Sequence, residues 1–443
     1  MANMLVSRKG TVVTVEFPDD GVEITAERIR DMYGEFTAEI YVYASLSFNG
    51  VMSTVRVNHS RPDLLNINDK DRLIGNLEEK TRDYPNLYWG EIVDAAVENI
   101  IEKHREGERE EIMADLGGYT PRTYAIKPLL VNGVANLIWA PGGSSKSYLS
   151  LLSCVMVDKG LSVHGLRARK GVALYLDWEE TAEVFRHRLA AVHKGLNIQP
   201  YSGIIYKRMK GSLADNVEYI SKLIMKHNIT FMVVDSVGAA LGGSGIDQDT
   251  VNQYFDAGNT LGITWLSVDH ANRAGETTGK WQIHGSAYKY NRSRQVYEVK
   301  KVQEHDSGDM EVVLYHRKAN DSGLKSPRGF SIHFESEQRF NSFEDDYDTV
   351  LQSVTFDTLE LADANDELLR PLSIGEICYN LVKTHGSQPL LKLSMTVARV
   401  KGVETVSEET IETSVNSDSR LMMSADNKTV VLVGVEEESE WTG

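Results

Sequence analysis

The sequence predicts an α/β protein whose central domain contains a mainly parallel β-sheet. Two observations support this fold class. Five short runs rich in β-forming residues occur in the middle of the chain, and several are apolar throughout, as in strands buried on both faces of a parallel sheet. Helical patterns between them are long enough for the crossover connections that parallel strands need. The runs are VANLIWA (134–140), GVALYLD (171–177), GIIYK (203–207), TFMVVD (230–235) and GITWLSV (262–268).

Length and composition fit a protein of several domains. The 443 residues are 41% hydrophobic and 25% charged, and a chain of this length is expected to form two or three cores. The two cysteines, Cys154 and Cys378, lie far apart, which excludes a disulfide framework and a cysteine zinc site. Neither a signal-peptide core nor an apolar run of about 20 residues is found, so we expect a cytoplasmic protein without membrane contact.

Charge is unevenly distributed along the chain. The formal net charge of −17 argues against a protein that coats nucleic acid through its overall charge. Residues 266–330 contain 11 Lys or Arg against 8 Asp or Glu, whereas residues 331–443 contain 8 against 22. Any contact with a polyanion is therefore expected in the middle of the chain.

Three segments before residue 371 differ in their patterns. Residues 1–105 combine strand-like runs with an amphipathic helix pattern, so we expect a small N-terminal α+β domain. Residues 118–335 contain the parallel strands. Near the end of this segment the alternating runs RQVYEVKKV, EVVLYHRK and GFSIHFE suggest an antiparallel extension of the sheet. Residues 336–370 are acidic and irregular and are expected to be a linker.

Residues 371–435 are expected to form a C-terminal winged-helix-like domain. Ser373 and Glu376 make a capping-box pattern at the start of one helix, and a second helix pattern starts after Ser407. A hairpin with its turn at 426–428 follows. The helix SEETIETSV contains three glutamates and no basic residue, so DNA phosphates would repel it, and a protein-docking role is the better expectation.

A candidate phosphate-binding loop follows the first parallel strand. Such a loop needs converging backbone amides, a lysine, a hydroxyl for Mg²⁺ and the N-terminus of a helix. The chain supplies these after Ala140, in the order Pro141, Gly142, Gly143, Ser144, Ser145, Lys146, Ser147 and Tyr148. The pattern predicts a site for ATP and Mg²⁺. An alternative is a serine-rich turn with an incidental Lys-Ser pair.

Two positions depart from the usual GxxxxGK[ST] pattern of this loop. Ala140 and Ser145 stand where the pattern has glycine. If Ser145 takes a left-handed backbone conformation, its Cβ costs about 1–2 kcal/mol. Several charge-assisted contacts to phosphate outweigh that cost, so the substitutions are compatible with nucleotide binding.

Carboxylates follow two of the predicted strands. Asp235 ends TFMVVD, where a second-shell partner for Mg²⁺ is needed, although it could also cap a helix. Asp177, Glu179 and Glu180 follow GVALYLD, and one of them could orient and deprotonate the water that attacks the γ-phosphate. Alternatively, these acids are solvated residues at the start of a helix.

The order and spacing of five motifs resemble those of RecA-like ATPases. The motifs are APGGSSKS, LYLDWEETAEVFRHRL, MVVDS, SVDHANRAG and HGSAYKYNRSR. They are most similar to the branch that contains the hexameric replicative helicase of broad-host-range plasmids and related phage AAA-type ATPases. The resemblance covers about residues 118–335 and implies a RecA-like P-loop core.

The resemblance implies roles for individual residues. Lys146 matches the phosphate-binding lysine, Ser147 the magnesium hydroxyl, Asp235 the second magnesium-side acid and Glu179 the residue that activates water. His270 matches a γ-phosphate-sensing position, although two neighbouring positions of that motif differ. In isolation His270 would be interpreted as a partly exposed histidine at a strand end.

Two further basic residues match positions that act between subunits in this family. Arg294 matches an arginine inserted into a neighbouring subunit's site, and Lys318, in HRKANDSG, resembles the lysine of a degraded KxRxG-like element. Without the matched spacing, Arg294 would be interpreted as surface charge. A site that needs a second subunit implies a homo-oligomer, which the resemblance makes a ring, and a hexamer is expected.

The resemblance also places two segments near the axis of such a ring, residues 239–249 and 271–285. Arg273, Lys280 and Trp281 combine charge and stacking in a way that suits single-stranded DNA, although polar glycine-rich loops are also commonly just flexible. The leading hypothesis is an ATP-dependent DNA motor similar to a hexameric replicative helicase of a phage or other mobile element. Replication proteins are possible partners of its outer domains. The alternatives are a filament-forming recombination or strand-loading ATPase and a nucleotide-regulated scaffold without enzymatic activity.

Overall fold

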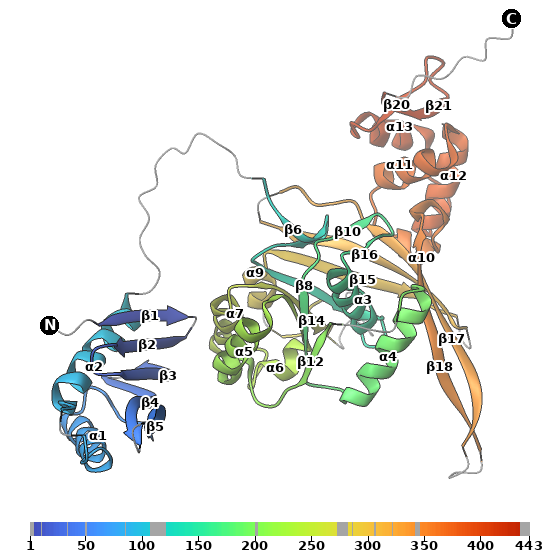
Figure 1. Cartoon of the computed structure of the whole chain (residues 1–443). Coiled ribbons are helices and arrows are strands. Elements are labelled where there is room, and N and C mark those ends of the chain that lie inside the picture. The colour runs from blue at the N-terminus through green and yellow to red at the C-terminus, as the bar shows by residue number, and fades with distance from the viewer. Residues whose placement is uncertain are drawn as a thin grey trace, which may run out of the picture. The chain divides into compact units, whose positions relative to one another are not determined.

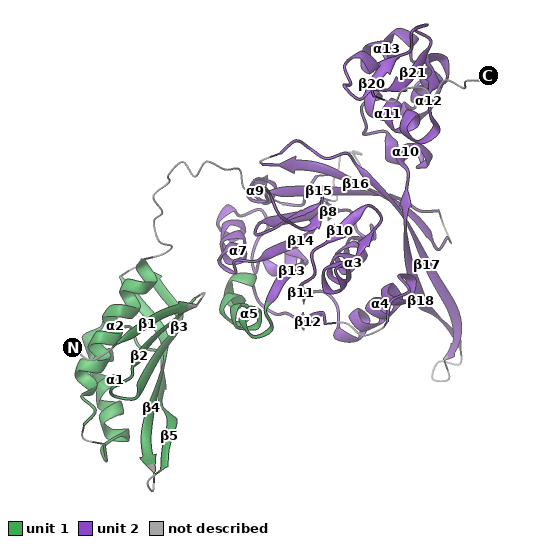
Figure 2. Cartoon of the chain, turned by 45° about the horizontal axis from the view of Figure 1, so that its top comes forward, with its two compact units in different colours: residues 1–121, 213–228 green, residues 122–212, 229–443 purple. Residues whose placement is uncertain are grey.

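The computed structural model describes residues 4–9, 11–32, 34–48, 51–84, 86–106, 121–199, 203–272, 282–285, 287–304, 307–320, 322–341 and 346–434. The chain forms two compact units, one of residues 1–121 with 213–228 and one of residues 122–212 with 229–443 (Figure 2). Within the described ranges we find no helix that is long and apolar enough to span a bilayer.

The first unit contains a five-stranded antiparallel sheet in which neighbours in sequence are neighbours in space. Its strands are β1 (Leu5–Lys9), β2 (Val12–Phe17), β3 (Val22–Met32), β4 (Glu35–Phe48) and β5 (Val51–Ser60). Helices α1 (Ile67–Lys80) and α2 (Trp89–Arg105) follow, and the apolar stripe of α2 is buried in one core with the inner faces of the strands. Helix α5 (Leu213–His227) belongs to the same unit, and its Lys222 forms an ion pair with Glu27.

The second unit is built on a nine-stranded sheet in the order β12-β11-β13-β14-β8-β15-β16-β17-β18. The first six strands are parallel to one another. They are β8 (Ala135–Ala140), β11 (Val172–Asp177), β12 (Ile205–Arg208), β13 (Ile229–Asp235), β14 (Thr264–His270) and β15 (Gln295–Val302). All six residues of β8 are buried, as expected for a strand covered on both faces.

The strand register brings polar residues to one edge of the sheet. Ala140, the last residue before the candidate phosphate loop, pairs with His270 at the end of β14. Asp177 at the end of β11 pairs with Asp235 at the end of β13. Because ligands of open α/β sheets bind beyond the carboxyl ends of the strands, this edge is where a site is expected.

Helices connect these strands (Figure 1). They are α3 (Lys146–Lys159), α4 (Ala182–Gly195), α6 (Val237–Ala240), α7 (Gln248–Thr260) and α9 (Ala287–Arg292). A smaller four-stranded sheet consists of β6 (Tyr124–Lys127), β7 (Leu130–Val131), β9 (Ser162–Val163) and β10 (Leu166–Ala168). Close packing of α7 on the sheet depends on Gly258, where a Cβ would lie 2.4 Å from the ring of Trp265.

The antiparallel part of the sheet differs from the prediction in two ways. The run RQVYEVKKV forms β15, which pairs parallel with β8, so the antiparallel part starts one strand later. The hairpin of β17 (Arg328–Asn341) and β18 (Asp346–Leu359) follows β16 (Asp309–Ala319), and residues 336–341 and 346–359 of this hairpin were expected to belong to a linker. The acidic side chains hid the alternation, in which Val354 and Phe356 face the core. Figure 1 shows this hairpin extending beyond the other strands.

The C-terminal part of the second unit has its own cluster of buried apolar residues. Its elements are η1 (Leu361–Asp363), α10 (Asp366–Leu369), α11 (Ile374–His385), β19 (Gln388–Pro389), α12 (Leu390–Lys401), α13 (Glu408–Asn416), β20 (Leu421–Met423) and β21 (Thr429–Leu432). The predicted capping box is confirmed, because the Ser373 side chain accepts from the Glu376 N–H and the Glu376 side chain accepts from the Ser373 N–H. The sequence patterns missed α12.

Candidate nucleotide site

A cavity of about 460 Å³ lies at the polar edge of the large sheet. It combines the phosphate-loop candidate with the acids that follow β11 and β13 and with the histidine that ends β14. Its lining residues are Gly143, Ser144, Ser145, Lys146, Ser147, Tyr148, Glu179, Glu180, Arg188, Asp235, Val268, His270, Gln303, Met310 and Phe334. The candidate loop and four of the predicted catalytic residues therefore meet in one place.

The loop between β8 and α3 has a left-handed residue directly before the helix. Ser145 has φ 57° and ψ 19°, the conformation that the missing glycine would adopt without strain. Helix α3 starts at Lys146, and its first N–H groups have no partner inside the helix. These N–H groups and the positive end of the helix dipole make the loop suitable for an anion.

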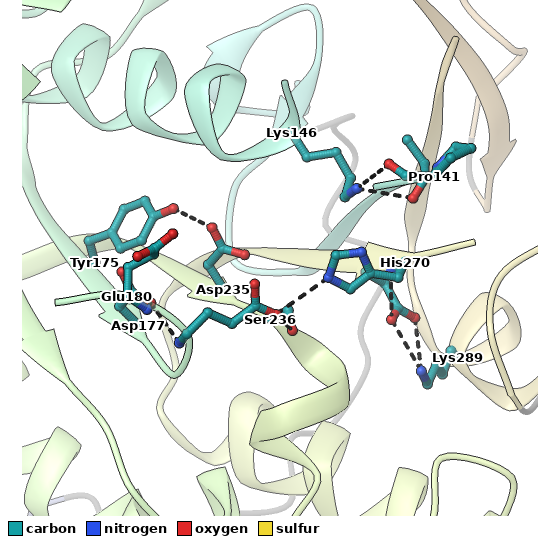
Figure 3. A network of polar contacts seen from close by, with 12 residues as sticks. Pro141, Lys146, Tyr175, Asp177, Glu180, Asp235, Ser236, His270 and Lys289 are labelled. Carbon is teal, nitrogen blue, oxygen red and sulfur yellow. Dashed lines mark hydrogen bonds and ion pairs between the residues drawn. The ribbon is translucent and has the colours of Figure 1, made fainter. Parts of the chain in front are cut away.

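The lysine of the loop is folded against the loop itself. Lys146 Nζ donates hydrogen bonds to the carbonyl oxygens of Ala140 at 3.0 Å and Pro141 at 2.8 Å (Figure 3). The residue is only 4% exposed, and burial lowers the pKa of its ammonium, whereas the charges of Asp235 and Glu179 raise that pKa. The direct hydrogen-bond partners of this ammonium are uncharged carbonyls. A phosphate in the cavity would supply the compensating negative charge.

Asp235 and Ser147 form a pair suited to Mg²⁺. Tyr175 Oη donates to Asp235 Oδ2 at 2.5 Å, and a hydrogen bond with the Ser147 side chain favours the ionised carboxylate, but burial is stronger and raises the pKa of Asp235. A divalent cation would stabilise the ionised form. Among the described residues no group of three or more His, Cys, Asp or Glu side chains could hold a metal, so a bound Mg²⁺ would need water and phosphate ligands. Helix α6 has Ser236, not Asp235, at its N-cap, which leaves the capping alternative for Asp235 without support.

The three acids after β11 have different surroundings. Asp177 Oδ1 accepts from the N–H groups of Glu179 and Glu180, each at 2.9 Å, so this buried carboxylate holds the turn. Glu180 pairs with Arg188 at 3.0 Å. Glu179 instead lies beside the ends of β13 and β14. Its Oε1 accepts a hydrogen bond from Ser236 Oγ, directly after β13, at 2.5 Å.

Glu179 is ionised by its neighbours. His270 Nε2 lies 3.4 Å from Glu179 Oε1, and this hydrogen bond, with further contributions from Ser236 and Lys146, lowers the pKa of Glu179 to about 2. The side chain is 45% exposed, so water can reach it. A carboxylate with so low a pKa is a weak base, and it suits orientation of a water molecule better than complete removal of its proton.

Arg294 lies at the opposite end of β8. Its N–H donates to the carbonyl oxygen of Ala135 at 2.9 Å, at the first residue of the strand whose last residue is Ala140. Five residue steps in a strand span about 16 Å. Arg294 is exposed, and no ion pair of its side chain is found in the described part of the chain. Nearby Arg292 differs, because it pairs with Asp256 and its guanidinium lies 6.0 Å from the centre of the Phe255 ring.

The predicted lysine Lys318 lies close to Arg294 and not in the cavity. Its Nζ donates to the carbonyl oxygens of Tyr290 at 2.9 Å, Asn291 at 2.7 Å and Ser293 at 2.8 Å. These three carbonyls belong to the last turn of α9 and the residue before Arg294. All three donors of the ammonium are therefore used within its own chain.

The predicted nucleic-acid residues Arg273, Lys280 and Trp281 lie outside the described residues. One described residue of their segment, Gly285, lies close to the other predicted loop. Gly285 has φ +87°, and a Cβ there would lie 2.3 Å from the carbonyl oxygen of Gly245. Gly245, in the predicted segment 239–249, and Gly285, the last residue of the predicted segment 271–285, are therefore close to each other.

Sequence patterns missed several residues that lie near the site without lining its cavity. Lys301 ends close to the phosphate loop, since a Cβ at Gly143 would lie 3.7 Å from its Nζ. Asp269 and Lys289 form an ion pair at 2.9 Å with side chains only 2% and 1% exposed. No local motif identifies these residues, because their positions depend on which strands are neighbours. The pairing of β15 with β8 was the missing information.

One comparison with known proteins, the family model, covers the loop. Residues 104–276 match the family model of an AAA domain. A KaiC-like protein of the hyperthermophilic archaeon Pyrococcus horikoshii OT3 aligns over 52% of this chain and 98% of its own, with 12% identity and a TM-score of 0.35. No curated protein sequence matches the chain. The family match covers less than half of the chain, and together with the geometry of the loop and the acids it supports a P-loop ATPase domain.

Proposed function

We propose that the protein is an ATP-dependent DNA motor of the RecA-like type, similar to a hexameric replicative helicase, which hydrolyses ATP between subunits and moves along single-stranded DNA. One observation carries this proposal. Arg294 is exposed and lies about 16 Å from the phosphate loop of its own chain, by the length of β8. This separation from its own phosphate loop supports our proposal that Arg294 acts on the nucleotide of a neighbouring copy.

In the proposed mechanism, an arginine other than Arg188 stabilises the γ-phosphate. Arg188 lines the cavity, but it pairs with Glu180 at 3.0 Å and lies 5.7 Å from the centre of the Tyr148 ring. Phosphoryl transfer spreads negative charge over the γ-phosphate oxygens, and an arginine from a second subunit stabilises that charge in related enzymes. We assign this role to Arg294.

The positions of the other site residues support the remaining roles that we propose. The amides of the loop and Lys146 hold the phosphates, and Ser147 and Asp235 hold Mg²⁺, which neutralises phosphate charge when bound. Glu179 orients the attacking water. His270, in contact with Glu179 at the end of β14, lies where it can respond to the γ-phosphate.

We place the DNA contact on the two loops that meet at Gly245 and Gly285. Arg273, Lys280 and Trp281 would provide charge and stacking for a single strand. The C-terminal elements, which we interpret as a winged helix, present Glu408 and Glu409 at the start of α13. This helix would dock a protein partner, such as a replication protein, because it would be repelled by DNA phosphates.

The test compares Arg294→Ala with Arg292→Ala, a matched control from the same short segment. Arg294→Ala should lower the ATPase rate by about 10³-fold or more, the loss typical of an arginine supplied by a second subunit. Arg292→Ala, which removes a contact within the chain, should change the rate by less than about tenfold. Both are measured with and without single-stranded DNA.

Three results would contradict the proposal: a normal rate for Arg294→Ala, no stimulation by DNA, or no unwinding of a forked duplex by the wild type. Electron micrographs of the same preparation distinguish closed rings from filaments on DNA. Filaments would favour a recombination or strand-loading ATPase. An ATPase rate unchanged by Lys146→Ala would show that the loop does not act in catalysis.

A further inference from the structure

The Lys318 ammonium lies near a second cation, Arg294, and its hydrogen-bond partners are unusual for a charged group. Its ammonium donates three short hydrogen bonds to backbone carbonyls, and none of these partners is acidic. Burial lowers its pKa, and the nearby charge of Arg294 lowers it further. Such a residue has no donor left for a phosphate unless it gives up a contact within its own chain.

The three carbonyls belong to the backbone that leads into Arg294. Tyr290 and Asn291 lie in the last turn of α9, and Ser293 directly precedes Arg294. A lysine at a helix C-terminus satisfies carbonyls that have no partner inside the helix. Here it also joins that turn to β16, the strand that carries Lys318.

The backbone of Arg294 is fixed on both sides of this contact. Its N–H donates to Ala135 at 2.9 Å, and its carbonyl oxygen accepts from Asn320 N–H at 3.3 Å. The start of α9 is fixed as well, because Lys289 forms the buried ion pair with Asp269, the residue before His270. The ion pair of Lys289 with Asp269 thus joins the segment that carries Arg294 to the end of β14, where His270 contacts Glu179.

We propose that Lys318 is a positioning residue for Arg294 and does not itself contact the nucleotide. This inference rests on the proposed role of Arg294 between subunits. The Lys318 ammonium holds the turn after α9 in one conformation, and the exposed side chain of Arg294 extends from that fixed backbone. Without the ammonium, three carbonyls lose their donor and the turn is free to shift.

The test uses Lys318→Met, which keeps most of the chain length but removes the donors, and Lys318→Arg, which keeps donors. A misplacement of about 1 Å in a catalytic group can cost 10²-fold in rate, so Lys318→Met should lower kcat by about 10- to 100-fold. The KM for ATP should stay within about twofold, because Lys318 is outside the nucleotide cavity. Lys318→Arg should recover most of the lost kcat.

The double variant that combines Lys318→Met with Arg294→Ala gives the decisive measurement. If Lys318 acts only through Arg294, adding Lys318→Met to Arg294→Ala should cause no further loss of kcat. A further loss equal to that in the wild-type background would overturn the proposal, as would a normal kcat for Lys318→Met. Thermal unfolding of each variant shows whether it folds. If Lys318→Met does not, Lys318→Gln replaces it, because a glutamine amide has two N–H donors and leaves at least one of the three carbonyls without its donor, so a smaller loss of kcat is expected.

The outcome for Arg294→Ala alone separates this inference from the proposed function. A normal rate for that variant contradicts the role of Arg294 and with it the proposed function. A strong loss for Arg294→Ala with no effect of Lys318→Met contradicts only the positioning role.

Discussion

Replacing Ser145 by glycine should stabilise the protein without weakening nucleotide binding. Ser145 has φ 57° and ψ 19°, and a left-handed conformation costs a residue with a Cβ about 1–2 kcal/mol. Glycine avoids this cost, but the greater freedom of glycine in the unfolded chain offsets about 0.4–1 kcal/mol of it. The net gain is about 0.5–1 kcal/mol, which in a unit of this size raises Tm by about 2 °C.

The control for this prediction is Ser145→Ala. Alanine keeps the Cβ and removes the hydroxyl, whose described contact is with Met310 Sδ at 3.1 Å. We therefore expect Ser145→Ala to behave like the wild type in calorimetric unfolding, and Ser145→Gly to unfold at a higher temperature. A titration with an ATP analogue should give the same Kd for all three proteins within about threefold.

Two results would refute this reasoning. If Ser145→Gly unfolds at or below the temperature of Ser145→Ala, the left-handed conformation carries no cost at this position. If Ser145→Gly weakens nucleotide binding by about tenfold or more, the serine contributes to binding and is more than a tolerated replacement for glycine.

Three further predictions concern the site and the packing around it. Glu179→Gln should lower kcat by about 10²-fold or more in a steady-state ATPase assay. Because the pKa of Glu179 is about 2, the ratio of the variant rate to the wild-type rate should stay constant from about pH 6 to 8.5, and a ratio that changes would show that the carboxyl titrates in that range. Asp269→Asn leaves the Lys289 ammonium buried without its partner and should lower the free energy of unfolding by about 3–5 kcal/mol in urea; a loss below about 1 kcal/mol would contradict that burial. Gly258→Ala should destabilise by about 1–2 kcal/mol net, because the cost of a Cβ against Trp265 exceeds the gain in helix propensity, and unchanged urea stability would contradict the close packing.

Local sequence patterns were sufficient to predict those structural features that depend on interactions between residues close together in the chain. The buried parallel strands follow from continuous apolar runs such as that of β8. The start of α11 follows from the capping box of Ser373 and Glu376, and the start of α3 follows from the loop pattern before Lys146. The left-handed conformation of Ser145 is the one that the sequence analysis considered as a condition, from its place in that pattern.

Features that depend on strand order could not be read from the chain. The first half of β17 was predicted as a strand, but its end and β18 fall in the segment interpreted as a linker, because acidic residues dominate the composition there and only alternate positions are buried. The proximity of Lys301 to Gly143 requires that β15 lie beside β8. The three hydrogen bonds from Lys318 to backbone carbonyls require the pairing of β15 with β16, in which Lys318 lies opposite Val296.

The central claim is that each ATP site is completed by Arg294 of another copy, and mixing two inactive variants tests it most directly. Lys146→Ala lacks a working phosphate loop but keeps Arg294, whereas Arg294→Ala has the reverse defect. Each alone should be inactive, and an equimolar mixture should recover roughly a quarter of the wild-type ATPase rate, because random assembly pairs an intact loop with an intact arginine at about one interface in four. No recovery on mixing, with both variants folded and assembled, would contradict the claim.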